Sequence, residues 1–318
     1  MLTSISAQDQ PVEPGYPSGT PILRIFANVH HELDGPSKAF EVRRVYLGYK
    51  YNLNESYSIE VKVDIGSQDD IMVYTDLRRY AYFKTAALYW EKGMWNVRAG
   101  IIDTEHYRLQ EKFWKHRYIY KSMQDQHKFG PKADLGTTVI FTPMDKLSAD
   151  VSVMNGEGYT NLQRDNTFKY SAGISMFPIP QMIFRIYYDL ENKEVNQSTL
   201  SSFMGFQNQG FSAGAEYNRK FNKNSDPDHH QNGYSTYLMY DVSEKFELFC
   251  RYDHLSSNAL QAYDDPWNLE NDGSTLIGGI QFHPIQQVKF ALNFQNWISK
   301  ETALDNAHFI FLNLEVAL

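Results

Sequence analysis

Several features are scarce or missing in this 318-residue sequence, and each absence excludes a class of protein. The single cysteine, Cys250, rules out an internal disulfide. No stretch approaches the roughly 18–20 consecutive apolar residues that a membrane-spanning helix needs. A net charge of −8 argues against nucleic acid as a partner. The chain is therefore neither a disulfide scaffold nor a helical membrane protein.

Catalytic and metal-binding signatures are also absent. The sequence contains no Gly-x-Ser-x-Gly, no His-Glu-x-x-His and no Cys-x-x-Cys-His. Adjacent histidines occur at His30–His31 and His229–His230, but neighbouring residues on a strand point to opposite faces. We therefore expect no enzyme activity, no cofactor and no metal site.

What the sequence does contain is an alternation of apolar and polar residues. Between residues 56 and 65, Ile59, Val61 and Val63 fall on one face of a strand, and Glu60 and Lys62 fall on the other. Aromatic residues make up 15% of the chain, yet the mean hydropathy is −0.51. A transmembrane β-barrel reconciles these values, because only alternate strand residues meet lipid and aromatic side chains gather at the interfaces.

The fold class that we predict is all-β, a single antiparallel transmembrane barrel of about 16 strands. Seven tight links alternate with eight longer polar gaps, which predicts short periplasmic turns and long extracellular loops. The segment 199–221 is split at Asn208, because one strand there would break the parity of the count. The predicted strands are 22–32, 38–51, 56–66, 81–90, 95–103, 133–141, 147–155, 167–177, 182–191, 199–207, 210–221, 232–241, 246–254, 274–283, 288–298 and 308–317.

The N-terminal residues 1–19 are predicted to form a flexible leader, and residues 20–318 form the barrel. Ser-x-Ala before Gln8 resembles the end of a signal peptide, so the leader is interpreted as a signal-peptide remnant. An ordinary flexible N-terminus is the alternative.

The more polar set of each strand is expected to face a hydrated lumen. A Lys or Arg facing lipid near the midplane would cost about 2–4 kcal/mol, which favours the inward orientation. The predicted pore wall consists of Lys62, Arg98, Arg185, Arg251, Lys289, Glu60 and Asp64.

The long loop 104–132 differs from the rest of the chain in its charge. It carries seven Lys or Arg against three Asp or Glu, although the whole chain is acidic. Residues 105–125 contain no Gly or Pro, which predicts a short helix. The stripe of this helix that is predicted to pack against the barrel wall consists of Leu109, Phe113, His116 and Tyr120. Rings of Lys and Arg favour anions in pores. The loop could fold inward and narrow the lumen, plug it, or remain outside and pair with lipopolysaccharide. The predicted pore constriction is Arg108, Lys112, Lys115, Arg117 and Lys121.

Three runs in order carry a family resemblance: Phe-Trp-Lys-His-Arg-Tyr at 113–118, Phe-Gly-Pro-Lys-Ala-Asp-Leu-Gly at 129–136 and Asn-Gly-Glu-Gly-Tyr at 155–159. Together with residues 214–218 and 246–253, they resemble phosphate-selective porins of the O/P type from Bacteroidetes-like bacteria. The resemblance covers residues 22–318 and implies a sixteen-stranded outer-membrane channel with a narrowed lumen. One departure is the C-terminus, which ends in Leu318 where many outer-membrane barrels end in Phe.

The resulting functional expectation is an outer-membrane porin for passive diffusion of small hydrophilic solutes, with a preference for anions. The expected partners are outer-membrane lipid or lipopolysaccharide, the solutes, and further copies of the chain or a larger outer-membrane complex. The alternative is a structural barrel subunit of a secretion or assembly complex, with its lumen plugged.

Overall fold

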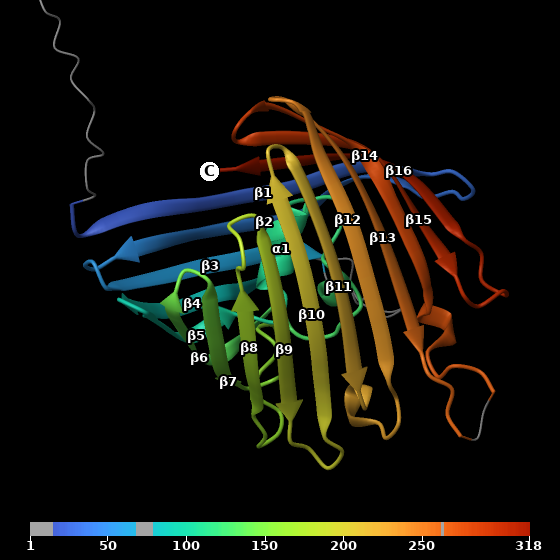
Figure 1. The fold of residues 1–318 in the computed structure, drawn as a ribbon. Coiled ribbons are helices and arrows are strands. Elements are labelled where there is room, and N and C mark those ends of the chain that lie inside the picture. Colours follow the sequence, from blue (N-terminus) through green and yellow to red (C-terminus); the bar gives the residue numbers. More distant parts are fainter. Residues whose placement is uncertain (1–14, 68–78, 262–263) are drawn as a thin grey trace, which may run out of the picture.

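The computed structural model describes residues 15–67, 79–261 and 264–318. Within them sixteen antiparallel strands form one closed barrel, in which each strand pairs with its sequence neighbours and β1 closes the ring against β16 (Figure 1). The predicted fold class is thereby confirmed. Of the predicted leader, residues 1–14 lie outside the described residues, and the first strand already begins at Ser18.

The strand bounds agree with the predicted ranges except at their ends, where most strands extend by a few residues and a few, such as β8, are shorter. They are β1 Ser18–Glu32, β2 Lys38–Asn52, β3 Tyr57–Ser67, β4 Arg79–Lys92, β5 Trp95–Asp103, β6 Ala133–Met144, β7 Leu147–Met154, β8 Lys169–Met176, β9 Met182–Glu191, β10 Gln197–Asn208, β11 Phe211–Phe221, β12 Gln231–Ser243, β13 Phe246–Ser257, β14 Gly273–Ile285, β15 Val288–Ser299 and β16 Ala307–Ala317.

The described helices are short and lie in the connections between strands. They are α1 (Arg108–Trp114), α2 (Met123–Gln126) and the 3-10 turns η1 (Lys223–Ser225) and η2 (Leu269–Asn271). None of these described helices has the length and apolar character to cross a bilayer.

The connections divide the barrel into a short-turn end and a long-loop end. Two-residue turns such as Gly93–Met94 and Gln209–Gly210 join neighbouring strands at the short-turn end. Gly93 and Gly210 have φ values of 58° and 80°, a backbone conformation that glycine adopts without steric cost. The turn at 209–210 confirms the split of the segment 199–221 into two strands.

The outward faces of the strands are apolar. Side chains such as Leu88, Ile186, Leu238 and Leu312 are exposed on the described surface. Contiguous apolar surface of this extent is unfavourable in water and suits contact with lipid.

Aromatic side chains lie near both ends of this outward face. Tyr217, Tyr234 and Tyr252 lie toward the long loops, and the paired rings of Trp95 and Phe141, 4.5 Å between centroids, lie toward the short turns. Aromatic girdles of this kind mark the two bilayer interfaces of membrane barrels.

Two β-bulges interrupt the alternation on adjoining parts of the wall. The β1–β2 register skips Arg43, and the β3–β4 register skips Lys84. A bulge inserts one residue and reverses the phase of those that follow. As a result Arg43 and Arg44 both line the lumen, and Lys84 and Thr85 are both buried there. The lipid-facing phase stays apolar on either side of each bulge.

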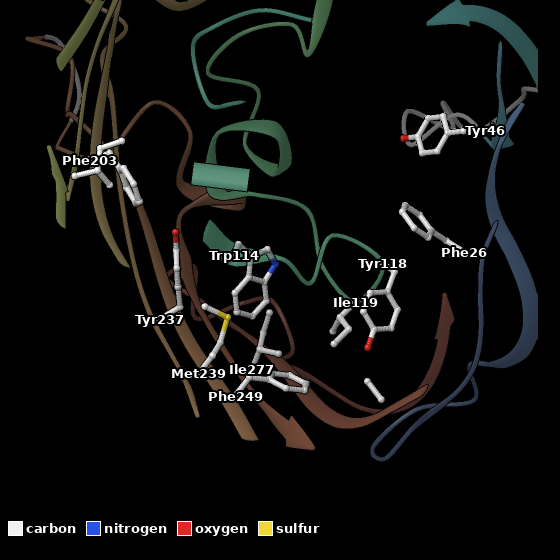
Figure 2. Close-up of a cluster of buried hydrophobic side chains, with 12 residues drawn as sticks. Phe26, Tyr46, Trp114, Tyr118, Ile119, Phe203, Tyr237, Met239, Phe249 and Ile277 are labelled. Carbon is white, nitrogen blue, oxygen red and sulfur yellow. The ribbon is translucent and has the colours of Figure 1, made fainter. Parts of the chain in front are cut away.

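The hydrophobic core lies inside the barrel. It is built between the loop 104–132 and lumen-facing residues of the wall, as Figure 2 shows for Trp114 against Tyr237, Met239 and Phe249. Sequence patterning assigned the polar set of each strand to the lumen. The more polar set does face inward, but on the strands where the loop docks it also contains buried apolar residues: Ile183, Phe203, Met239, Phe249 and Ile277.

Candidate functional site

The loop 104–132 leaves the wall and returns to it at one point, between the adjacent strands β5 and β6. The backbone N–H of Thr104 donates to the carbonyl of Lys132 at 3.0 Å, and the Thr104 hydroxyl donates to the carbonyl of Pro131 at 2.8 Å. These bonds close the base of the loop, so the whole segment between them is free to enter the lumen.

The helical part of the loop is shorter than predicted. The helix α1 ends at Trp114 because Lys115 takes the left-handed conformation, with φ 58°. Leu109 and Phe113 therefore share a helical face, but His116 and Tyr120 follow in a turn. All four still pack inward: His116 is buried, and Leu109, Phe113 and Tyr120 border the core.

Apolar contacts hold the loop against the far wall. The Trp114 ring lies 5.4 Å from Tyr237 between centroids, and the Phe113 ring lies 5.3 Å from Phe203. Tyr118 reaches toward the opposite side of the lumen, 6.4 Å from Phe26 (Figure 2). Trp114, Tyr118 and Ile119 are each at most 2% exposed. These side chains of the loop are thus as deeply buried as the core residues of a soluble protein.

Polar side chains of the wall satisfy the backbone carbonyls of the loop. A buried carbonyl without a partner would cost about 1–3 kcal/mol, so each bond favours the docked position. The bonds run from Arg185 to Glu105 (2.9 Å), Arg251 to Lys121 (2.9 Å), Gln231 to His127 (3.0 Å), Thr199 and Lys220 to Phe129 (3.2 Å each), Asn313 to Tyr118 (3.3 Å) and Gln295 to Ile119 (3.4 Å).

Three of the predicted wall cations lie beneath the loop, where they do not face open lumen. Arg98, Arg185 and Arg251 are 8%, 3% and 2% exposed. Arg98 pairs with Glu105 of the loop, Arg185 with Asp150 at 2.7 Å and Arg251 with Asp253 at 2.6 Å. Their position indicates that they fasten the loop to the wall.

The remaining predicted wall residues form ion pairs with charged side chains at neighbouring positions of the wall. Lys62 pairs with Glu60 at 2.8 Å, Asp64 with Arg44 at 2.9 Å and Lys289 with Glu315 at 2.9 Å. These pairs lie on strands β2, β3, β15 and β16. This part of the wall therefore carries many charged side chains, but its net charge is close to zero.

Two cavities among the described residues border the docked loop, one toward the short turns and one toward the long loops. The short-turn cavity, about 440 Å³, is lined by Arg24, Arg108, Lys112 and Lys115 among others. The long-loop cavity, about 780 Å³, is lined by residues of β2–β4 and by Lys121 and other residues of the loop. Seven described cations and three carboxylates line the former, and eight cations and four carboxylates line the latter. Both cavities therefore carry an excess of positive side-chain charge.

Arg117 and Lys132 line both cavities and thus form the partition between them. Arg117 pairs with Asp125 at 3.0 Å and with Glu111 at 3.4 Å, and Lys132 pairs with Glu111 at 2.7 Å. Burial lowers the pKa of Lys132, as does the neighbouring Arg117, and the two carboxylates oppose this shift. The partition consists of two cations held in place by two carboxylates.

The five residues of the predicted constriction do not form one ring. Arg117 lies in the partition, Lys121 lines the long-loop cavity, and Arg108, Lys112 and Lys115 line the short-turn cavity. Within the described chain neither Lys112 nor Lys115 has an ion-pair partner, whereas Arg108 pairs with Glu105 at 3.0 Å.

Sequence reasoning missed Lys132, Arg43 and Lys84 as lumen residues. Lys132 precedes β6 directly and was counted only in the loop charge. A signal for the two bulge residues is present in the sequence. In β2 the outward apolar residues have even numbers at Phe40 and Val42 and odd numbers after the bulge. In β4 they change from odd to even numbers.

Acidification should loosen the docked loop. Burial lowers the pKa of His127 to about 4, with help from Arg251 and Lys223 and against Asp253. Burial and neighbouring cations also hold the pKa of His106 well below 6.5. Because an undocked histidine binds its proton near pH 6.5 and the docked one does not, docking weakens progressively as the pH falls from about 6.5 to 4. Hydrogen–deuterium exchange of the loop amides, corrected for the intrinsic pH dependence of exchange, should become faster over this range.

The pH dependence has a matched control. The double variant H106Q/H127Q should show a flatter pH profile of loop exchange, whereas H229Q, which alters a half-buried histidine in the connection between β11 and β12, should behave like the wild type. Equal protection of the wild-type loop at pH 7 and pH 4.5 would contradict the assignment.

No cluster of three or more His, Cys, Asp or Glu side chains with metal-binding geometry occurs among the described residues.

Comparisons with known proteins locate the chain by its structure. No family model matches the sequence, and no curated protein matches it. Solved structures, in contrast, do match the fold of this chain. Salmonella typhi OmpF, in a complex with daunomycin, superposes with a TM-score of 0.70 at 6% identity, covering 95% of this chain and 98% of OmpF.

Two further structures are similar over the whole chain. An anion-selective porin from Comamonas acidovorans gives a TM-score of 0.67 at 9% identity, over 95% of this chain and 99% of the porin. The outer membrane channel DcaP of Acinetobacter baumannii gives a TM-score of 0.65 at 8% identity, over 94% of this chain and 97% of DcaP. This chain therefore has the closed sixteen-stranded barrel fold that these outer-membrane channels share.

Proposed function

We propose that the protein is a passive channel of the bacterial outer membrane that conducts small hydrophilic solutes and favours anions. The closed barrel, its apolar outward face and its two aromatic girdles support a membrane location. The structural similarity to outer-membrane channels adds to this support. In this orientation the short turns face the periplasm and the long loops face outside.

The observation that carries the anion preference is the excess of cations on both sides of the partition at Arg117 and Lys132. Fixed positive charge in a confined, water-accessible lumen concentrates anions and repels cations. One structural relative is described as an anion-selective porin, which agrees with this proposal. The cavities on both sides of the loop favour a channel over a plugged accessory subunit.

Finer features of the proposal rest on the sequence. The resemblance to O/P-type porins of Bacteroidetes-like bacteria supports the channel role, and the basic composition of the loop 104–132 supports the preference for anions. Association into a homo-oligomer is proposed because a relative of the same fold, OmpT of Vibrio cholerae, is described in a trimer form. Lipopolysaccharide remains the proposed lipid contact at the long-loop end.

Neutralising three loop cations of the short-turn cavity should reduce anion selectivity. In the triple variant R108Q/K112Q/K115Q, the zero-current potential in a KCl gradient should move toward zero. We expect the chloride-to-potassium permeability ratio to fall about threefold or more, because nearby fixed charges set the local ion concentrations. Planar bilayer recording measures both the potential and the conductance.

The control neutralises the same number of cations outside the lumen. The variant K92Q/K146Q/K245Q removes exposed lysines at the short-turn end and should leave the permeability ratio unchanged. An unchanged ratio in the lumen variant would contradict anion filtering. A wild-type protein without any conductance would contradict the channel itself and favour the plugged subunit.

A further inference from the structure

One wall of the long-loop cavity combines aromatic and cationic side chains in a regular arrangement. Tyr80 and Tyr82 occupy consecutive lumen-facing positions of β4 and both line the cavity. Their rings stack with centroids 6.2 Å apart and an interplanar angle of 28°. The pair forms an aromatic surface at a place where the lumen is otherwise polar.

Strand register places arginine directly beside this aromatic surface. Arg44 of β2 pairs with Gly66 of β3, and Gly66 pairs with Tyr80. Adjacent strands lie about 4.8 Å apart, so a guanidinium and an aromatic ring flank a position that has no side chain. Asp64, next to Tyr82, accepts a bond from Arg44 at 2.9 Å and holds its side chain against the wall.

The bulge in β2 adds a second arginine to the same place. Without it, one of the consecutive residues Arg43 and Arg44 would face lipid. The register skips Arg43, and both side chains line the cavity. Bulges commonly redirect side chains at functional sites. A lysine pair would supply the same charge, but arginine also offers the planar donor geometry that matches a carboxylate.

We propose that this wall is a binding site for small carboxylates that carry a flat apolar face, such as aromatic carboxylates or uronic acid sugars. The ring or the C–H face of the solute packs on Tyr80 and Tyr82, and its carboxylate accepts hydrogen bonds from Arg43 and Arg44. The cavity of about 780 Å³ has the size of a small-molecule site. The inference rests on the proposed anion channel and names the class of solute that it selects.

The site is tested by solute block of the KCl current in planar bilayers, with benzoate, galacturonate and acetate added at the long-loop side. Benzoate or galacturonate should reach half-block at a concentration about tenfold lower than acetate, because acetate offers a carboxylate without a ring. Whichever of benzoate and galacturonate blocks at the lower concentration shows whether the site prefers an aromatic carboxylate or a uronic acid sugar. Equal block by all three solutes would overturn the proposal.

Variants separate the two halves of the site. Y80A/Y82A should raise the half-block concentration of the effective solute about tenfold and leave that of acetate unchanged. R43Q should weaken the block by all three solutes. The control Y89A removes a lumen-side tyrosine of the same strand near Lys50, away from the cavity, and should have no effect. Unaltered block in Y80A/Y82A, with a folded barrel shown by heat-modifiable gel migration, would overturn the site.

A failure of the channel and a failure of the site give different results. If the wild type conducts no current, titration calorimetry of the detergent-solubilised protein with the same three solutes tests binding alone. Ring-dependent binding that Y80A/Y82A abolishes would then support the site, and its absence would overturn it.

Discussion

Replacing residues 106–130 with a short Gly–Ser linker should raise the single-channel conductance about threefold or more, since about sixteen strands enclose an aqueous channel when no loop fills it. The replaced segment contains Trp114, Tyr118 and Ile119, which fill the lumen against the far wall. The bonds between Thr104 and residues 131–132 keep the loop ends together, so a linker of a few residues closes the gap without strain.

Bilayer recording of the purified variant measures this effect, with heat-modifiable gel migration as the test of folding. The control replaces residues 300–305, an exposed connection between β15 and β16 that lines neither cavity, with Gly–Ser of equal length. Its conductance should equal that of the wild type. If the linker variant also conducts like the wild type, the loop does not limit the passage.

Removing the side chain of Arg251 should cause the largest loss of stability among single substitutions. Its Nε and Nη2 donate to the Asp253 carboxylate at 2.8 and 2.6 Å, and its Nη1 donates to the carbonyl of Lys121 at 2.9 Å. The guanidinium also lies 4.9 Å from the centre of the Trp114 ring. R251A leaves Asp253, 1% exposed, without this partner, so we expect the free energy of unfolding to fall by about 3–5 kcal/mol.

Urea unfolding in detergent, followed by tryptophan fluorescence, measures this loss. The double variant R251M/D253N removes both charges and should be markedly more stable than R251A, because no unpaired carboxylate is left buried. K289A should cost at most about 1 kcal/mol, because Lys289 is partly exposed and Glu315 keeps its contact with Arg24. Equal losses in R251A and K289A would show that Arg251 does not fasten the loop.

The strands could be predicted from the sequence because the two-residue period of a strand depends only on neighbouring residues. Each pair of neighbours along the chain already shows which side meets lipid and which meets the lumen. The count of sixteen followed from turn residues and from parity, including the split at Asn208. Where the pattern changes phase, at Arg43 and Lys84, the signal was present but its meaning required the register of the partner strand.

The site was only partly predictable. Charge and aromatic content marked the loop 104–132 as distinctive, and Arg117 was among the residues chosen. Its partnership with Lys132 across the partition was not evident. The sequence also gave no reason to place Arg98, Arg185 and Arg251 beneath the loop, because each looks like any other inward-facing cation of a strand.

The sequence by itself determined the closed sheet and its apolar outward face. The alternation of apolar and polar residues and the residues that form turns both act between near neighbours in the chain. Only the tertiary structure decided where the loop lies and which cavities it borders. The contacts that place it join residues far apart in the chain, such as Tyr118 with Gln281 and Lys121 with Arg251. Such pairs come together through closure of the barrel, and no local pattern encodes them.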